Sequence, residues 1–169
     1  MGRKGRKGRK GTASGGYGMS MKGMDRETRI AMLVHHHKHP RHRGPLADAE
    51  VVVKGGNPDC GDLITIWARA NGERLEAVTF EGEGCTLSQA AASLLAERVN
   101  HEHPTLTDLL AEPENRIMDE IGRDISDHRP RCATLALGTL QTAAKKLAMN
   151  RQLAAAGKTE ADIRALRGE

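Results

Sequence analysis

Three cysteines and one aspartate have the residue types expected of a single metal or sulfur site. Cys60 and Asp62 stand two residues apart in the chain. Cys85 follows a glycine-containing bend, and Cys132 follows a segment with two arginines. Three soft sulfur ligands and one carboxylate suit a tetrahedral Zn²⁺ with one weaker ligand. The same thiolates could instead hold an iron–sulfur cluster, so the sequence predicts a metal centre and leaves its metal open.

Each of these residues also has an ordinary structural interpretation. An isolated cysteine is often a small buried apolar side chain, and an aspartate after a glycine is often a turn or cap residue. The metal interpretation therefore depends on whether the fold brings the separated segments together.

Hydrophobic periodicity predicts an α+β arrangement of the elements that position these residues. Strands are expected at 50–54, 63–70 and 74–81, and helices at 25–38, 86–99, 105–111, 114–125 and 132–149. A capping box that begins at Thr159 predicts a further short helix near the C-terminus.

A predicted β-hairpin brings two of the cysteine segments close together. Asn71-Gly72 is the typical pair for a two-residue type I′ turn between the second and third strands. This turn sets a register in which Asp62 lies opposite Glu81 and Cys60 projects beyond the strand end. Cys85 is then expected at the same open end of the hairpin.

Two of the three cysteines, Cys85 and Cys132, lie at predicted helix N-termini. Unpaired N–H groups and the helix dipole favour a thiolate at such positions. Arg129 and Arg131 are expected to strengthen this effect beside Cys132. The sequence thus predicts thiols that are deprotonated and able to act as ligands or nucleophiles.

Composition limits the class of protein. The chain has 169 residues, enough for one ordinary domain, and its three cysteines, without a signal peptide or a long apolar run, predict a cytoplasmic protein with no membrane partner. We expect a disordered basic Gly/Arg/Lys tail at 1–23, one domain at 24–150, and a C-terminal extension with a short helix at 151–169. Six basic residues among the first ten exceed the net charge of +4. We therefore expect no nucleic-acid role outside the tail.

A cluster of histidines near the end of the first helix offers a second possible metal site. These residues are His35, His36, His37, His39 and His42. Neutral imidazole is a common ligand, but consecutive helical residues point in different directions and only pairs such as His35 and His39 share a face. A polar helix end is the preferred interpretation.

The three cysteine segments resemble the motifs of the IscU/NifU N-terminal family of iron–sulfur cluster assembly proteins. The motifs are at 57–62, 82–90 and 129–136, and the resemblance covers about residues 30–147. Arg131 stands where the scaffold branch of that family has a histidine, and the scaffold's Leu-Pro-Pro-Val-Lys motif is missing. With these features and with Arg129 three residues before Cys132, the sequence resembles the SufU branch of the family. The resemblance implies a three-stranded antiparallel sheet with an N-terminal helix and several C-terminal helices packed on it.

The resemblance also implies a function and roles for individual residues. A SufU-type protein is a zinc-dependent sulfur acceptor for a PLP-dependent, SufS-like cysteine desulfurase, one half of a two-component sulfurtransferase rather than a stand-alone enzyme. Its Zn²⁺ ligands would be Cys60, Asp62, Cys85 and Cys132. Cys60 would accept the sulfur, Asp62 would tune the lability of the site, and Arg129 would stabilise the transferred sulfur or the docked partner.

Two alternative functions remain open. In the first, Cys60, Cys85 and Cys132 hold iron or a [2Fe–2S] cluster, and the protein is a scaffold that passes the cluster to downstream assembly proteins or apo-proteins. In the second, which is less favoured, the protein is a structural zinc domain whose basic tail binds nucleic acid.

Overall fold

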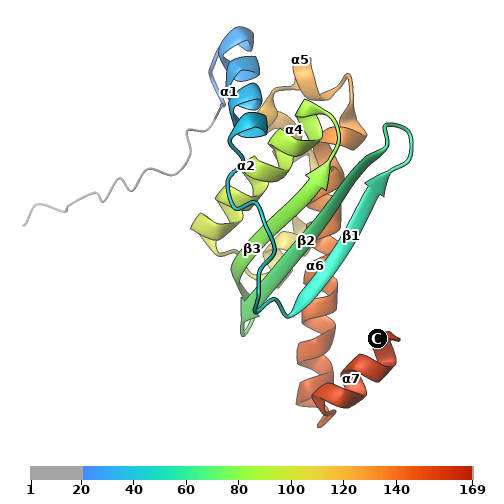
Figure 1. The fold of residues 1–169 in the computed structure, drawn as a ribbon. Helices are drawn as coiled ribbons and strands as arrows, with labels where there is room; N and C mark the ends of the chain where they lie inside the picture. Colours follow the sequence, from blue (N-terminus) through green and yellow to red (C-terminus); the bar gives the residue numbers. More distant parts are fainter. Residues whose placement is uncertain (1–20, 169) are drawn as a thin grey trace, which may run out of the picture.

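A three-stranded antiparallel sheet with helices packed on one face is the frame of the structure (Figure 1). The computed structural model describes residues 21–168. Its elements are α1 (Arg26–Lys38), β1 (Val51–Asn57), β2 (Asp62–Asn71), β3 (Arg74–Glu83), α2 (Thr86–Glu102), α3 (Leu106–Ala111), α4 (Glu114–Ile121), α5 (Arg123–Ser126), α6 (Pro130–Ala155) and α7 (Glu160–Arg167). The strands lie in the order β1-β2-β3, α2 and α6 contact the sheet, and α1 packs on α2. The predicted fold class is confirmed.

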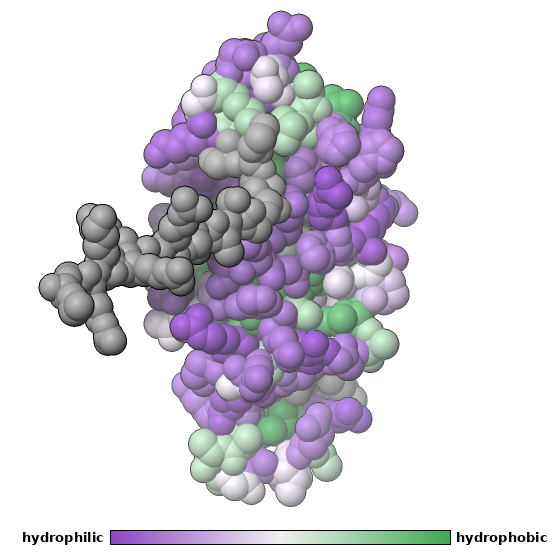
Figure 2. All heavy atoms as spheres, turned by 90° about the vertical axis from the view of Figure 1, so that its left-hand side faces the viewer, coloured by the Kyte–Doolittle hydropathy of each residue, from purple (hydrophilic) through white to green (hydrophobic). Residues whose placement is uncertain are grey.

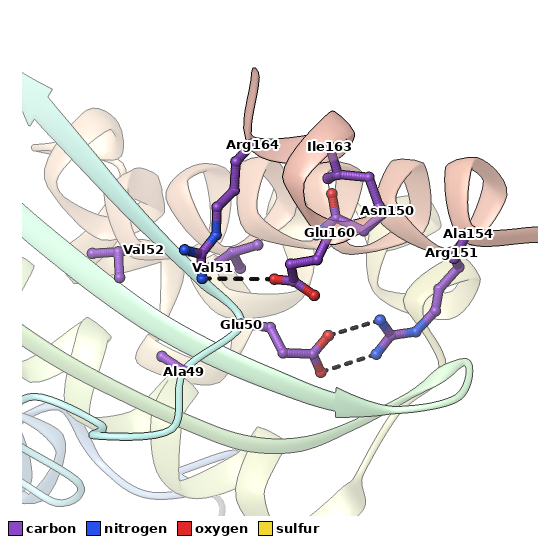
Figure 3. A pocket seen from close by; sticks show the side chains of 10 residues that line it. All are labelled: Ala49, Glu50, Val51, Val52, Asn150, Arg151, Ala154, Glu160, Ile163 and Arg164. Carbon is purple, nitrogen blue, oxygen red and sulfur yellow. Dashed lines mark hydrogen bonds and ion pairs between the residues drawn. The ribbon is translucent and has the colours of Figure 1, made fainter. Parts of the chain in front are cut away.

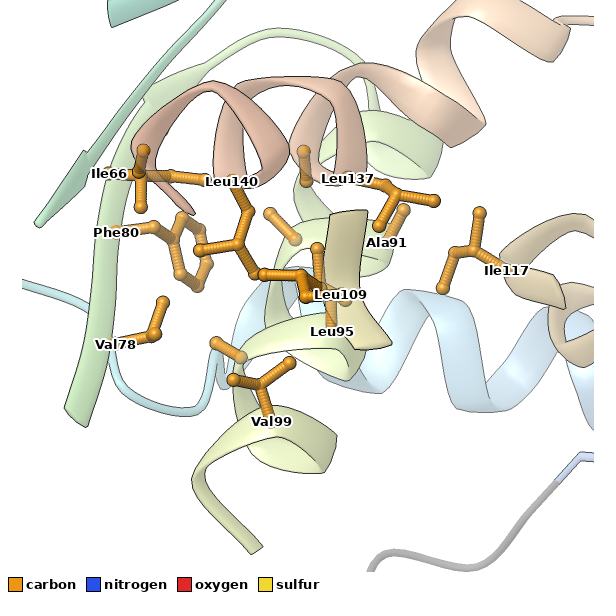
Figure 4. Close-up of a cluster of buried hydrophobic side chains, with 14 of the residues drawn as sticks. Ile66, Val78, Phe80, Ala91, Leu95, Val99, Leu109, Ile117, Leu137 and Leu140 are labelled. Atoms are coloured by element: carbon orange, nitrogen blue, oxygen red, sulfur yellow. The ribbon is translucent and has the colours of Figure 1, made fainter. Parts of the chain in front are cut away.

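The core lies between the sheet and the two helices that contact it. Side chains alternate across β2, so that Ile64 and Ile66 are buried whereas Leu63 is 57% exposed. In Figure 4, Ile66 and Phe80 from the sheet lie next to Leu140 from α6. These side chains are fully or almost fully buried. Because Phe80 is the only phenylalanine of the chain, aliphatic side chains supply nearly all of this core.

The turn of the β2–β3 hairpin differs from the prediction. Asn71 pairs with Arg74, so the two turn residues are Gly72 and Glu73 rather than Asn71 and Gly72. Gly72 has a φ of +58°, whereas Glu73 is not among the residues with positive φ. Positive φ at the first central residue alone is the pattern of a type II′ turn, and a type I′ turn needs it at both. The expected type I′ turn is wrong because only the glycine adopts the left-handed backbone.

The predicted register of the hairpin is therefore also wrong. A β-bulge between Arg69 and Ala70 adds one more residue of shift, since a bulge opposes two residues to one. As a result Glu81 pairs with Thr65, and Glu83 pairs with Leu63. Asp62 lies one residue beyond this last pair, close to the backbone of Cys85.

Two of the predicted helices differ in their boundaries from the structure. The predicted helix at 114–125 is divided into α4 and α5 at Gly122, which has a φ of +106°. The long helix α6 runs from Pro130 to Ala155, whereas the sequence predicts a helix at 132–149. The capping box at Thr159 is confirmed, with Asp162 as its partner.

The predicted disordered tail at 1–23 is described only in its last residues. Met21, which the sequence analysis placed in this tail, is fully buried. Residues 1–20 of the predicted tail lie outside the described residues.

The histidine-rich end of α1 joins the fold through a single buried ring. His36 is 3% exposed, and its Nδ1 lies 2.9 Å from the Ser93 hydroxyl of α2. The same hydroxyl accepts a hydrogen bond from the backbone N–H of Arg41 at 2.8 Å. Burial lowers the pKa of His36, although the charge of Glu97 opposes this effect. Among residues 21–168 these histidines form no group of three potential metal ligands.

One face of the molecule is mostly polar (Figure 2). Figure 2 shows a face dominated by hydrophilic side chains, with hydrophobic areas that are small and separate. The larger exposed apolar side chains include Leu63 at 57% and Val52 at 46%, both on strands. Within the part of the chain that the structure describes, no helix has the length and apolar character needed to cross a membrane.

Candidate metal centre

The predicted site residues meet at one end of the sheet, where the β1–β2 turn, the end of β3 and the start of α6 lie together (the upper end in Figure 1). Cys60 is exposed in the β1–β2 turn. Asp62 begins β2 and is 1% exposed. Cys85 is the N-cap residue of α2, and Cys132 lies in the first turn of α6 with 1% exposure.

Three of the four residues have ligand atoms close enough to share one ion. One ligand atom each of Cys60, Asp62 and Cys132 lies within 4.8 Å of the other two. The sulfurs of Cys60 and Cys132 are 3.4 Å apart. Two ligands held at about 2.3 Å from one ion can be at most about 4.6 Å apart. The donor set and its spacing therefore fit a zinc or iron ion after small side-chain movements.

Cys85 lies beside this group but not within it. Its sulfur accepts a hydrogen bond from the Ser88 N–H at 3.4 Å as the N-cap of α2, and lies 3.8 Å from Asp62 Oδ2. The structure thus brings Cys60, Asp62 and Cys132 together as one group, and places Cys85 next to it. For Cys85 to bind the same ion, its side chain must turn away from the cap position.

Asp62 is held in place by the start of α2. The backbone N–H of Cys85 donates to Asp62 Oδ1 at 2.8 Å. Gly84 makes this approach possible, because a Cβ atom at that position would stand 2.2 Å from Asp62 Oδ1. Gly84 also has a φ of +148°, which favours glycine. The glycine-containing bend before Cys85 is therefore required by the carboxylate beside it.

We expect the substitution Gly84→Ala to displace Asp62 and to lower zinc affinity by about 10-fold or more, the usual effect of disturbing groups that orient a metal ligand. Gly61→Ala is the matched control, because Gly61 also has positive φ but an added Cβ would meet nothing within 4 Å. Chelator competition measures the zinc affinity of both variants. Equal zinc affinity in Gly84→Ala and the wild type would contradict this account of the bend.

The electrostatics of Cys132 differ from the prediction. In the metal-free protein, burial raises the pKa of the Cys132 thiol far above its usual value, and hydrogen bonding to Asp62 and Cys60 adds to this effect. Removal from water thus favours the protonated thiol while no metal is bound, in contrast to the thiolate expected at a helix N-terminus. A metal ion must therefore displace this proton when it binds.

The two arginines before Cys132 have different surroundings. Arg131 forms an ion pair with Asp59, which connects the start of α6 to the β1–β2 turn. The side chain of Arg129 is exposed, and its backbone carbonyl accepts from the N–H groups of Cys132 and Ala133, each at 3.1 Å. The structure gives Arg129 a capping role, and its role in sulfur transfer stays a prediction.

One residue of the site has no role in the sequence-based prediction. Asn57 is 5% exposed, and its Nδ2 lies 3.7 Å from the sulfur of Cys132. The available signal is its place before Pro58, where asparagine often caps a turn with its own side chain. The contact with Cys132 joins residues that are 75 positions apart, so local sequence could not reveal it.

A pocket at another place in the fold does not compete with this site. It has a volume of about 760 Å³ and lies between the start of β1, the end of α6 and α7 (Figure 3). Arg151 donates to both carboxylate oxygens of Glu50, at 2.7 and 2.9 Å, and Arg164 lies 3.8 Å from Glu160. Its charged side chains are thus paired with one another, and none of the predicted site residues lines it.

Comparisons with known proteins agree with the motifs and the fold. The family model of the NifU-like N-terminal domain matches residues 30–154. The iron–sulfur cluster assembly scaffold protein IscU of Streptococcus pyogenes serotype M1 is 31% identical over 134 residues, covering 70% of this chain and 84% of the relative. The zinc-dependent sulfurtransferase SufU of Bacillus subtilis is 40% identical over 68 residues, which is 40% of this chain and only 46% of the relative.

Solved structures show the same fold. A putative iron–sulfur cluster assembly scaffold protein for the SUF system from Fervidobacterium islandicum superposes with a TM-score of 0.58 at 23% identity, covering 67% of this chain and 93% of that one. A NifU-like N-terminal protein from Brucella abortus gives a TM-score of 0.57 at 17% identity, covering 66% and 88%. The match of the family model over most of the chain confirms the resemblance predicted from the three cysteine motifs. The protein belongs to the NifU-like N-terminal domain family of iron–sulfur cluster assembly proteins.

Proposed function

We propose that this protein accepts sulfur on Cys60 from a SufS-like cysteine desulfurase, as a zinc-dependent sulfur acceptor in iron–sulfur cluster assembly. The observation that carries the proposal is the contrast between Cys60 and the other two members of the ligand group. Cys60 is exposed at a turn, whereas Asp62 and Cys132 are each 1% exposed. One sulfur is thus open to a partner protein, and two buried ligands remain to retain a metal.

The proposed transfer is a thiol–persulfide exchange at Cys60. The Cys60 thiolate attacks the outer sulfur of the desulfurase persulfide, and a new S–S bond forms on Cys60. The S–S bond of the desulfurase breaks, and its cysteine leaves as a thiolate. The transferred S–H group keeps its proton, so no further oxidant or reductant is needed. The exposed turn allows the approach that this attack requires.

The residues around Cys60 would hold the metal and keep the acceptor in place. Bound Zn²⁺ would supply the Lewis acidity that keeps cysteine ligands deprotonated at neutral pH. Cys60, Cys132 and Asp62 would bind it, with Cys85 as the fourth ligand once its side chain leaves the cap position. Asp62 is the hard, weaker donor of this set, and the N–H of Cys85 fixes one of its oxygens.

The variant Asp62→Asn separates the charge of this residue from its structural role. Asparagine keeps an oxygen that can accept from the Cys85 N–H but removes the anionic ligand. We expect a melting temperature close to that of the wild type, with zinc affinity lower by at least about 10-fold. Chelator competition and thermal unfolding measure the two effects. Unchanged zinc content and unchanged sulfur transfer would make Asp62 a turn residue only.

A second candidate function is favoured by a match that covers most of a relative's length. The Streptococcus pyogenes relative, matched over 84% of its length, is named as a scaffold, and the cysteines proposed here could also hold a [2Fe–2S] cluster. In that function iron and sulfur are cargo that the protein passes to apo-proteins.

Desulfurase turnover distinguishes the two functions. A zinc-loaded, iron-free sample should accelerate cysteine desulfuration if the protein is a sulfur acceptor. If only a reconstituted, cluster-loaded sample is active, and its activity is the transfer of the cluster to an apo-protein, the scaffold function is correct. Zinc and iron counted per chain in the protein as isolated provide the independent check.

A further inference from the structure

We propose that Asn57 is a positioning residue of the metal centre, which holds the Cys60 turn with its backbone and donates to the sulfur of Cys132 with its side chain. The inference rests on the metal-binding part of the proposed function. According to this proposal, Asn57 helps the protein to retain its metal although it is not itself a ligand.

The first observation is the contact between Asn57 and Cys132. Asn57 ends β1 and is 5% exposed, so its amide has little access to water. Its Nδ2 lies 3.7 Å from the sulfur of Cys132, within the distance of an N–H···S hydrogen bond. A buried amide donor needs a partner, and for this N–H the partner is a ligand sulfur.

The second observation is the way in which Asn57 holds the turn that carries Cys60. The Asn57 carbonyl accepts from the N–H of Cys60 at 3.2 Å and from the N–H of Gly61 at 2.9 Å. Its side-chain Oδ1 accepts from the N–H of Asp59 at 3.3 Å. The side chain therefore imitates a backbone turn, as asparagine often does. The main chain of Asn57 thus holds Cys60, and its side chain holds the neighbouring Asp59 in the same turn.

The third observation is that the same residue also faces the carboxylate ligand. Asn57 is the strand partner of Asp62 at the end of the β1–β2 ladder. Asn57 thus contacts or pairs with each member of the group formed by Cys60, Asp62 and Cys132. Outer residues that hydrogen-bond metal ligands fix ligand orientation, and their loss typically costs about 10–100-fold in metal affinity.

The chemistry of an asparagine amide suits this place. Its N–H can donate to a sulfur while its oxygen accepts from the turn. An aspartate of nearly the same shape would keep the acceptor but lose the donor, and would set a negative charge beside a sulfur ligand. A serine could retain a turn hydrogen bond, but its hydroxyl is too short to reach Cys132.

The test compares Asn57→Asp and Asn57→Ser with Asn71→Asp, which makes the same chemical change at an exposed residue at the end of β2. Zinc affinity is measured by chelator competition, and Co²⁺ replaces zinc so that its absorption spectrum reports ligand geometry. We expect both Asn57 variants to bind zinc about 10–100-fold more weakly with an altered cobalt spectrum, and Asn71→Asp to match the wild type.

Two outcomes would overturn the proposal. One is zinc affinity within about twofold of the wild type in a folded Asn57→Asp, and the other is an unchanged cobalt spectrum in both Asn57 variants. If Asn57→Asp does not fold, Asn57→Ser decides by the same measurements. These measurements use the metal alone, without a desulfurase. Weakened metal binding with no sulfur transfer by the wild type would support the role of Asn57 and reject the sulfur-acceptor function.

Discussion

Replacing Cys60 with serine is expected to abolish sulfur acceptance and to return the desulfurase to the rate that it has alone. The serine hydroxyl is a far weaker nucleophile than a thiolate at neutral pH. The fold should persist, because Cys60 is exposed in the β1–β2 turn and its sulfur forms a hydrogen bond only with the sulfur of Cys132 among the side chains described. Desulfurase turnover with and without the variant measures this effect, and circular dichroism checks the fold.

Cys85→Ser is the matched control for the loss of one thiol. Serine is a good N-cap residue, so this variant should keep α2 intact. It removes a proposed fourth ligand but leaves the acceptor in place, and some stimulation of the desulfurase should remain. Full stimulation by Cys60→Ser would exclude Cys60 as the acceptor, whatever the metal content of the sample.

The largest effect on stability is expected from Arg98→Met. Arg98 is 3% exposed, and it donates to Glu112 at 2.5 and 3.1 Å and lies 3.6 Å from Glu120. Removal of one partner from a buried ion pair typically costs about 3–5 kcal/mol, because it leaves a buried charge uncompensated. Urea unfolding of the metal-free protein measures this loss in the free energy of unfolding.

Arg116→Met is the control for Arg98→Met. Arg116 pairs with Glu102 and Glu112, but its side chain is 48% exposed, so its loss should cost no more than about 1 kcal/mol. Equal losses in the two variants would contradict the importance of burial.

The pH dependence gives a second check on Arg98→Met. Burial raises the pKa of Glu120, and the charge of Arg98 opposes this rise. Without Arg98 the folded-state pKa should be higher still, which destabilises the fold while Glu120 is ionised. Protonation removes this penalty, so the difference in stability between variant and wild type should shrink as the pH falls.

Much of the fold could be predicted from local sequence. Buried and exposed side chains alternate along β2, and Cys85 and Thr159 cap the helices that follow them. These signals involve residues that are close together in the chain, so the sequence alone could reveal them. The hairpin register could not be predicted, because the bulge between Arg69 and Ala70 and the position of the turn are set by packing across the sheet. Cys60 and Cys85 still reach the same end of the sheet, since each follows the end of a strand there.

The sequence predicted which chain segments lie close together, but not the surroundings of each side chain. The cysteine motifs identify the chain segments, and the fold brings Cys60, Asp62 and Cys132 together. The raised pKa of the Cys132 thiol could not be predicted, because burial is a property of the whole fold and the helix N-terminus is a local one. The cap position of the Cys85 thiol and the contact of Asn57 with Cys132 depend likewise on tertiary structure.

Peptide mass mapping of the persulfide tests the sulfur-acceptor function most directly. The zinc-loaded, iron-free protein is incubated with a SufS-like desulfurase and cysteine, and its peptides are analysed without a reducing agent. The account predicts the added mass of one sulfur atom on the peptide that contains Cys60, and none on those with Cys85 or Cys132. Sulfur on either of the other cysteines, or on no cysteine while the desulfurase turns over, would contradict it.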